Sequence, residues 1–187
     1  MPAWKNGNLT VYHGTDNLQI TGITRPLIPS QLPKSVPFKP NLAACRPFTD
    51  FGKGFYTTTS LHQAKQWANA RVRRILAPHT GPQFAVVLGF EVDRDQLAAL
   101  NALVFVRDTQ DYWDFVQDCR LGFPPHQRSG VKQYYDVVYG PVALWPSQLL
   151  IQNCDQISFH MQAPSTPSTY LLKPEVVACA TAPGGLF

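Results

Sequence analysis

The segment DFGKGFYTTTS, residues 50–60, combines residue types that could surround a flat ring. Two glycines flank Lys53, and two aromatic residues and a run of hydroxyl side chains follow. Small residues permit a tight turn and a close approach between backbone and ligand. We place Tyr56 on a strand and Trp67, eleven positions later, on the next helix, so the two rings could face each other across a slot. On spacing alone, ordinary core packing of the two rings is the simpler interpretation.

A second segment, VYHGT (residues 11–15), puts a polar side chain beside a glycine at the predicted end of a strand. The His13 side chain could donate or accept a hydrogen bond. Because Gly14 has no side chain, a ligand could approach its backbone closely. Taken alone, a polar strand end is the simpler interpretation of this segment.

The composition predicts one soluble domain with a sizeable core. The chain has 187 residues, of which 44% are hydrophobic and only 15% are charged. Its length suits a single domain, with room for a tail. The net charge of +4 permits an anionic partner but does not single out nucleic acid.

The cysteines predict no metal site. They form no CxxC pair and have no histidine at metal-ligand spacing; they are Cys45, Cys119, Cys154 and Cys179. We expect reduced thiols in a cytoplasmic protein, and a disulfide in a secreted protein is the alternative. The first ten residues lack the features of a signal peptide, and no apolar run approaches the roughly twenty residues that cross a membrane. We therefore expect a cytoplasmic protein that makes no membrane contact, and action on another cell would need a route other than Sec.

The hydrophobic pattern predicts many strands and few helices. Helices are expected over 60–77, 93–100 and 108–122, with Asp93 as an N-cap and Gly122 as a C-terminal stop. Strands are expected over residues 9–14, 55–59, 83–92, 102–106, 134–144 and 154–161. Because strands and helices do not alternate regularly, the order favours an α+β domain with a curved or split sheet.

One proline-rich stretch lies within the predicted domain, and a second follows it. Residues 22–47 form a long loop with little periodicity, typical of a lid or a mobile segment. Residues 1–163 are predicted as the folded domain and 164–187 as a C-terminal tail. The end of the tail could dock back as a strand or lie loose.

Taken together, YHGT, then FGKGFY, then a helix carrying an aromatic residue resemble the ADP-ribosyltransferase superfamily. The match is closest to its poly-ADP-ribose-polymerase-like branch, in which a His–Gly strand end and an FGKGIY segment build the nicotinamide site. The wider pattern DFGKGFYTTT…QAKQWA, with YWDFVQDCR, YYDVVYGPVA and DQISFH, is similar to an uncharacterised bacterial family of that superfamily. The resemblance covers roughly residues 9–161 and is most specific over 50–68. It implies a split, curved, mixed β-sheet that holds NAD, as substrate, in an extended crevice.

The resemblance assigns roles to individual residues. His13 would hydrogen-bond the adenosine-side ribose, and the Gly14 backbone would pair with the nicotinamide amide. Tyr56 would stack on the nicotinamide ring, and Trp67 would close the opposite face, where other members often carry Tyr. The expected NAD-binding set is completed by Thr15, Lys53 and Gly54.

Two positions depart from the family pattern. Ala64 stands where many members have a serine that bonds the amide, a loss of about 1 kcal/mol of binding. The family's catalytic residue, usually Glu on a late strand, matches Gln156, which carries no charge. The neighbouring Asp155 should face the other side of the strand, and Glu175 on the tail is a rescue candidate. The catalytic triad is then His13, Tyr56 and Gln156.

The resemblance implies a bacterial mono-ADP-ribosyltransferase, a glycosyltransferase that cleaves the nicotinamide–ribose bond and passes ADP-ribose to an acceptor. A protein acceptor ranks ahead of nucleic acid or a small molecule. By analogy with the family alone, the setting is a toxin or effector, with an antitoxin or immunity protein as a candidate partner. The alternatives are an NAD glycohydrolase, a non-catalytic NAD- or ADP-ribose-binding module, and, ranked low, an enzyme that removes an RNA 2′-phosphate.

Further charged and aromatic residues lie on the predicted helices. Arg71, Arg73 and Arg74 are most simply a solvated helix face, although they could attract a phosphate. Trp113 and Arg120 are candidate contacts for the acceptor.

Overall fold

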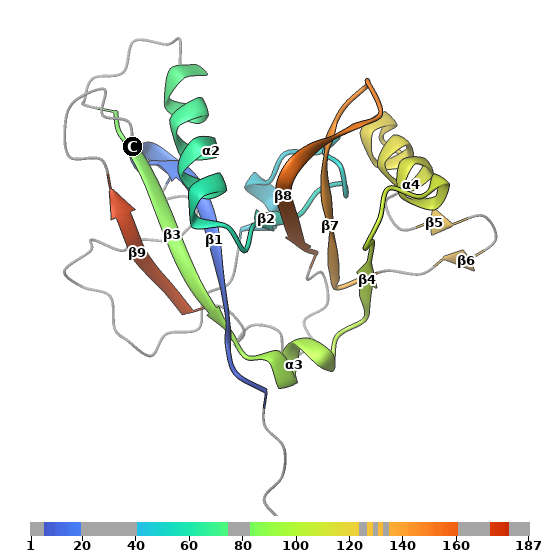
Figure 1. Ribbon diagram of the computed structural model, residues 1–187, viewed down its shortest axis with the longest axis horizontal. Coiled ribbons are helices and arrows are strands. Elements are labelled where there is room, and N and C mark those ends of the chain that lie inside the picture. The colour runs from blue at the N-terminus through green and yellow to red at the C-terminus, as the bar shows by residue number, and fades with distance from the viewer. Residues whose placement is uncertain are drawn as a thin grey trace, which may run out of the picture. The chain divides into compact units, whose positions relative to one another are not determined.

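The computed structural model describes residues 6–19, 41–74, 83–123, 127–128, 131–132, 135–160 and 173–179. The chain divides into two compact units (Figure 1). Unit 1 comprises Met1–Pro40, Thr57–Leu97 and Thr169–Phe187, and unit 2 comprises Asn41–Tyr56 and Ala98–Ser168.

Unit 1 is built on a three-stranded antiparallel sheet. The strand order is β1 (Leu9–Asp16), β3 (Ala85–Val92), β9 (Lys173–Cys179). The central strand β3 has the sequence AVVLGFEV and is buried along almost its whole length, as a continuous apolar run predicts. Helix α2 (Leu61–Arg74) runs alongside β1 and β3 (Figure 1), and the short helix α3 (Arg94–Ala98) follows β3.

The contact between α2 and β1 depends on small residues. A Cβ atom at Gly14 would lie 2.0 Å from the carbonyl oxygen of Ala64 and 2.9 Å from the amide nitrogen of Ala68. Both alanines are fully buried in an apolar cluster with Ala85 and Val87. The glycine in HGT is therefore required by the close approach of a helix to the strand.

Unit 2 is built on a four-stranded sheet. Its order is β2 (Phe55–Thr57), β8 (Leu149–Phe159), β7 (Val137–Leu144), β4 (Ala102–Val104). Strands β7 and β8 are antiparallel, and the edge strand β4 is parallel to β7. The unit also contains the 3-10 helix η2 (Leu42–Ala44), helix α4 (Gln110–Leu121) and the hairpin of β5 (Gln127–Arg128) and β6 (Val131–Lys132).

The core of unit 2 is aromatic. Phe51 lies at its centre, with its ring centroid 6.1 to 6.3 Å from those of four other rings. These four rings belong to Tyr56, Phe105, Tyr112 and Phe115. Helix α4 buries Tyr112, Phe115, Val116 and Cys119 in this core, together with Phe51 from the turn before β2.

The α+β class is confirmed, and most elements lie where the pattern places them. Helix α4 ends at Gly122, which adopts φ 81, and Asp93 caps α3 by accepting hydrogen bonds from two amides. Two strands extend beyond their predicted bounds, because β1 continues through Gly14 to Asp16 and β8 starts at Leu149. Strand β7 lies within its predicted range and passes Pro141 with a shift in register. Much of the predicted loop 22–47, and most of the tail outside β9, lie outside the described residues.

Replacing Gly14 by Ala should destabilise the protein, because the new Cβ would overlap backbone atoms of α2 that cannot rotate away. We expect a loss of about 2 kcal/mol in the free energy of unfolding, measured by chemical denaturation. Gly7→Ala is the matched control, since nothing lies within 4 Å of a Cβ there. Equal stability of the two variants would contradict the helix–strand contact.

Candidate functional site

Asp50, the first residue of DFGKGFYTTTS, is the centre of a buried polar cluster in unit 2. Its side chain is 3% exposed and accepts four hydrogen bonds. Oδ1 accepts from Arg120 Nε at 2.9 Å and from Nη2 at 2.5 Å. Oδ2 accepts from Gln156 Nε2 at 2.7 Å and from the Ala143 amide at 3.0 Å. The ion pair with Arg120 and two further N–H contacts offset the cost of burying this charge.

Gln156, the predicted catalytic residue, belongs to this cluster. Its side chain is 7% exposed, and Nε2 also donates to the Pro141 carbonyl at 2.9 Å. The same carbonyl accepts the Tyr112 hydroxyl at 3.0 Å. Both amide hydrogens of Gln156 are therefore used inside unit 2.

Tyr56, the predicted stacking residue, is held by the turn that precedes it. Its hydroxyl accepts the Phe51 amide at 2.8 Å and donates to the Gly52 carbonyl at 2.9 Å. The Thr49 hydroxyl lies 2.7 Å from the Tyr56 hydroxyl. Burial raises the pKa of the Tyr56 hydroxyl, and the hydrogen bonds with Thr49 and Phe51 lower it in part. The hydroxyl thus has a structural role, and only the half-buried ring is left for a ligand.

Gly54 and Lys53 also lie on this segment. A Cβ at Gly54 would meet the Ser158 hydroxyl oxygen at 2.2 Å and the His160 ring at 2.8 Å. The Lys53 side chain is exposed, while its carbonyl oxygen lies 3.2 Å from His160 Nδ1. The absence of a side chain at Gly54 is therefore explained by packing against the end of β8.

The remaining predicted residues lie in unit 1. Successive strand side chains point to opposite faces, and α2 covers the face at Gly14, so His13 and Thr15 point to the face away from α2. Thr15 is buried and His13 is half-buried. Trp67 is on α2 and is 43% exposed. Ala64, where the resemblance expects a serine, is buried against the sheet in an apolar cluster.

The backbone of Gly14 faces the edge of β1 that lies away from β3. The Tyr12 amide donates to Thr58 at 2.7 Å, and its carbonyl accepts from Thr58 at 2.9 Å, on the side of β1 away from β3. Alternate residues of a strand direct their N–H and C=O to the same side, so those of Gly14 point to this edge. Among the described residues, none forms a hydrogen bond with them there.

The three arginines at the end of α2 differ in their contacts. Arg71 forms an ion pair with Asp16, which is 1% exposed, whereas Arg73 and Arg74 are exposed. Trp113 and Arg120, the candidate contacts for an acceptor, both have partners within unit 2. Trp113 is 8% exposed in the aromatic core, and Arg120 binds Asp50.

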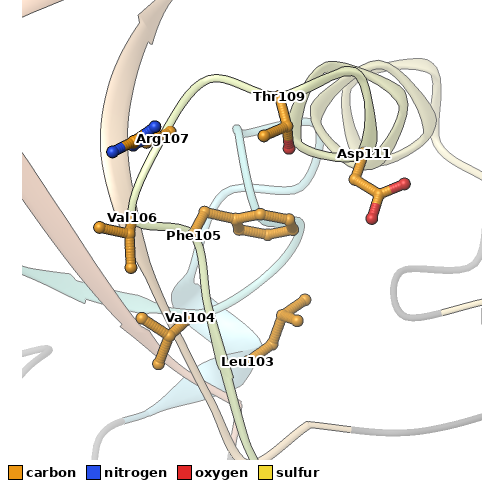
Figure 2. A pocket seen from close by; sticks show the side chains of 7 residues that line it. All are labelled: Leu103, Val104, Phe105, Val106, Arg107, Thr109 and Asp111. Carbon is orange, nitrogen blue, oxygen red and sulfur yellow. The ribbon is translucent and has the colours of Figure 1, made fainter.

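Unit 2 also has a surface hollow of about 380 Å³ between the end of β4 and the start of α4 (Figure 2). Figure 2 shows Leu103 and Phe105 on one side of the segment and Val104 and Val106 on the other. Val104 and Val106 are 54% and 82% exposed. None of the predicted NAD-binding residues lines this hollow, so it is not the predicted nicotinamide pocket.

The fold and the polar cluster define an α+β protein whose FGKGFY turn is tied to a late strand. The chain belongs to the family described as "Protein of unknown function (DUF3990)", whose model matches residues 35–146, more than half of the chain. No curated protein and no solved structure matches the chain. Within the described residues, no helix is long and apolar enough to cross a membrane, and no group of three His, Cys, Asp or Glu side chains could hold a metal ion.

The family match covers Asp50, Tyr56, Trp67 and Arg120, but not Gln156. Sequence reasoning missed Asp50 as a member of a site, and it gave Arg120 as a candidate acceptor contact rather than as the ion-pair partner of Asp50. The available signal was weak: an acidic residue directly before the glycine turn and a basic residue in the last turn of α4.

Replacing Arg120 by Met should leave the buried Asp50 carboxylate without its ion-pair partner. We expect the free energy of unfolding to fall by about 3 kcal/mol, measured by chemical denaturation. Arg73→Met on the exposed surface of α2 is the matched control and should change stability by under about 0.5 kcal/mol. A fall no larger than in the control would contradict the role given to the ion pair.

Proposed function

We propose that this chain is an NAD-dependent mono-ADP-ribosyltransferase. The observation that carries the proposal is the backbone edge at Gly14, whose N–H and C=O have no hydrogen-bond partner among the described residues. A primary amide, such as that of nicotinamide, has one acceptor oxygen and an NH₂ donor. One backbone N–H and one C=O on a strand edge match this pair. The packing of α2 against Gly14 holds this part of the strand in place.

Trp67 supports the proposal from the same unit. It is three residues after Ala64, whose carbonyl packs against Gly14, and it exposes 43% of its surface. The nicotinamide ring of NAD is flat and positively charged. An exposed indole can stack on such a ring and adds a cation–π attraction. In this proposal Ala64 provides no hydrogen bond, because it faces the apolar cluster.

Tyr56 and Gln156 supply the roles proposed for unit 2. The Tyr56 ring stacks on the nicotinamide, and its hydroxyl keeps the ring oriented through the turn at residues 49–52. Gln156 accepts a hydrogen bond from a hydroxyl of the nicotinamide ribose. His13 binds the adenosine-side ribose, and Thr15, Lys53 and Gly54 complete the proposed NAD contacts.

The reaction separates nicotinamide from the ribose. The C1′–nitrogen bond breaks, and both bonding electrons leave with nicotinamide, which departs neutral. Positive charge builds on C1′ and the ring oxygen, and a nucleophile of the acceptor attacks C1′ and loses a proton. A neutral amide at 156 stabilises this charge less than a carboxylate would, so we expect transfer of a single ADP-ribose rather than chain elongation.

The proposal also includes the split-sheet fold, a finer assignment than the α+β class. A three-stranded antiparallel sheet and a separate four-stranded sheet support the split-sheet fold of ADP-ribosyltransferases. A protein acceptor and a role as a bacterial toxin or effector, with an antitoxin or immunity partner, are proposed by analogy. The neutral amide of Gln156 favours one second candidate, a non-catalytic NAD-binding module.

Purified protein incubated with NAD should release nicotinamide, and Trp67→Ala should raise KM for NAD about tenfold, as expected for the loss of one stacking and cation–π contact. Release is measured by chromatography, and the thermal midpoint of Trp67→Ala should match wild type because the side chain is exposed. Phe123→Ala, which removes another exposed aromatic side chain, is the control and should keep the wild-type KM. NAD binding without release by wild type would favour the binding module, and absence of both would refute the proposed function.

A further inference from the structure

We propose that Asp50 is a positioning residue for Gln156, fixing which end of its amide is offered to the substrate. The inference rests on the proposed function, in which Gln156 contacts the nicotinamide ribose. Asp50 does not itself touch NAD in this proposal. It acts through the 2.7 Å hydrogen bond from Gln156 Nε2 to its Oδ2.

The neighbours of Gln156 leave the amide one orientation. The two groups in contact with Nε2 are the Asp50 carboxylate and the Pro141 carbonyl, and both are acceptors. Only the NH₂ end of the amide can satisfy both groups. A rotated amide would place Oε1 against two oxygen atoms and lose both hydrogen bonds. The chemistry of the neighbours therefore determines the position of the oxygen.

The fixed orientation leaves Oε1 as the end of the side chain that can accept a hydrogen bond from the substrate. Within the described part of the chain, no donor forms a hydrogen bond with Oε1. An acceptor is the group required to bind a ribose hydroxyl, which donates its hydrogen. The hydrogen bond to a carboxylate also polarises the amide and strengthens Oε1 as an acceptor.

Asp50 is well placed to hold Gln156 still. Arg120 and the Ala143 amide bind the same carboxylate, which is 3% exposed. Asp50 also belongs to the turn whose residues Thr49, Phe51 and Gly52 surround the Tyr56 hydroxyl. One short turn therefore orients both residues that unit 2 contributes to the proposed reaction.

The same geometry explains why position 156 is a glutamine. A glutamate there would bring a second carboxylate to within hydrogen-bond distance of Asp50 and face the Pro141 carbonyl. Two like charges so close in a buried place repel each other strongly. Asp50 and Gln156 are thus a chemically matched pair, and the departure from the Glu expected at 156 follows from the carboxylate at 50.

The first test separates turnover from binding. Asp50→Asn should lower kcat for nicotinamide release about tenfold, because a misplaced Gln156 amide stabilises the transition state less. KM for NAD should stay within about twofold, because Asp50 does not contact NAD in this proposal. Asp155→Asn, which removes the neighbouring carboxylate on β8, is the control and should keep the wild-type kcat. A folded Asp50→Asn variant with wild-type kcat would overturn the inference.

The second test needs no activity and covers the case in which Asp50→Asn folds poorly. Gln156→Glu alone should lower the thermal midpoint, because it sets two carboxylates against each other. The double variant Asp50→Asn with Gln156→Glu restores one amide and one carboxylate, so its midpoint should lie above that of Gln156→Glu. A double variant no more stable than Gln156→Glu would show that the two side chains are not coupled and would overturn the inference.

The outcomes distinguish this inference from the proposed function. Wild-type protein that neither binds NAD nor releases nicotinamide refutes the proposed function, and with it the role of Asp50 in turnover. Active wild-type protein whose turnover is insensitive to Asp50→Asn refutes the positioning role alone. A kcat loss in Asp50→Asn at constant KM, with recovered stability in the double variant, supports both.

Discussion

The buried carboxylate of Asp50 is the constraint on which unit 2 depends. A charge that is 3% exposed is tolerated only if donors surround it, and these come from distant parts of the chain. Arg120 reaches it from α4, the Ala143 amide from β7, and Gln156 from β8. The cluster therefore joins the glycine turn before β2 to a helix and two strands. The aromatic core around Phe51 packs beside it, so polar and apolar contacts fix the same turn.

Unit 1 depends on a steric constraint of a different kind. Helix α2 approaches β1 so closely that only a glycine fits at position 14, and Ala64 and Ala68 provide the facing surface. A serine at 64 would bring a hydroxyl into an apolar cluster, which is costly without a hydrogen-bond partner. This contact accounts for the Ala64 departure from the resemblance. It also holds the strand edge that the proposed function uses.

Local signals in the sequence predicted much of the fold. The helical period and the glycine stop defined α4, and the apolar run defined β3, because period and caps act over neighbouring residues. The Asp50 cluster could not be predicted, since its partners lie 70 to 106 positions away and no local pattern links them. Glycines 14 and 54 were selected correctly as special, but packing against α2 and β8 explains both without a ligand. Strand β7 continues past Pro141 because the register shifts there and the pairing with β4 ends at Tyr139.

The most direct test of the account is a calorimetric titration of the wild-type protein with NAD and, separately, with ADP-ribose, which lacks the nicotinamide. The central claim is that the chain binds the nicotinamide end of NAD, to which unit 1 contributes the Gly14 edge and the ring of Trp67. The account predicts that NAD binds and that ADP-ribose binds at least about tenfold more weakly, the equivalent of about 1.4 kcal/mol. Equal affinity for the two ligands, or no binding of NAD, would contradict it.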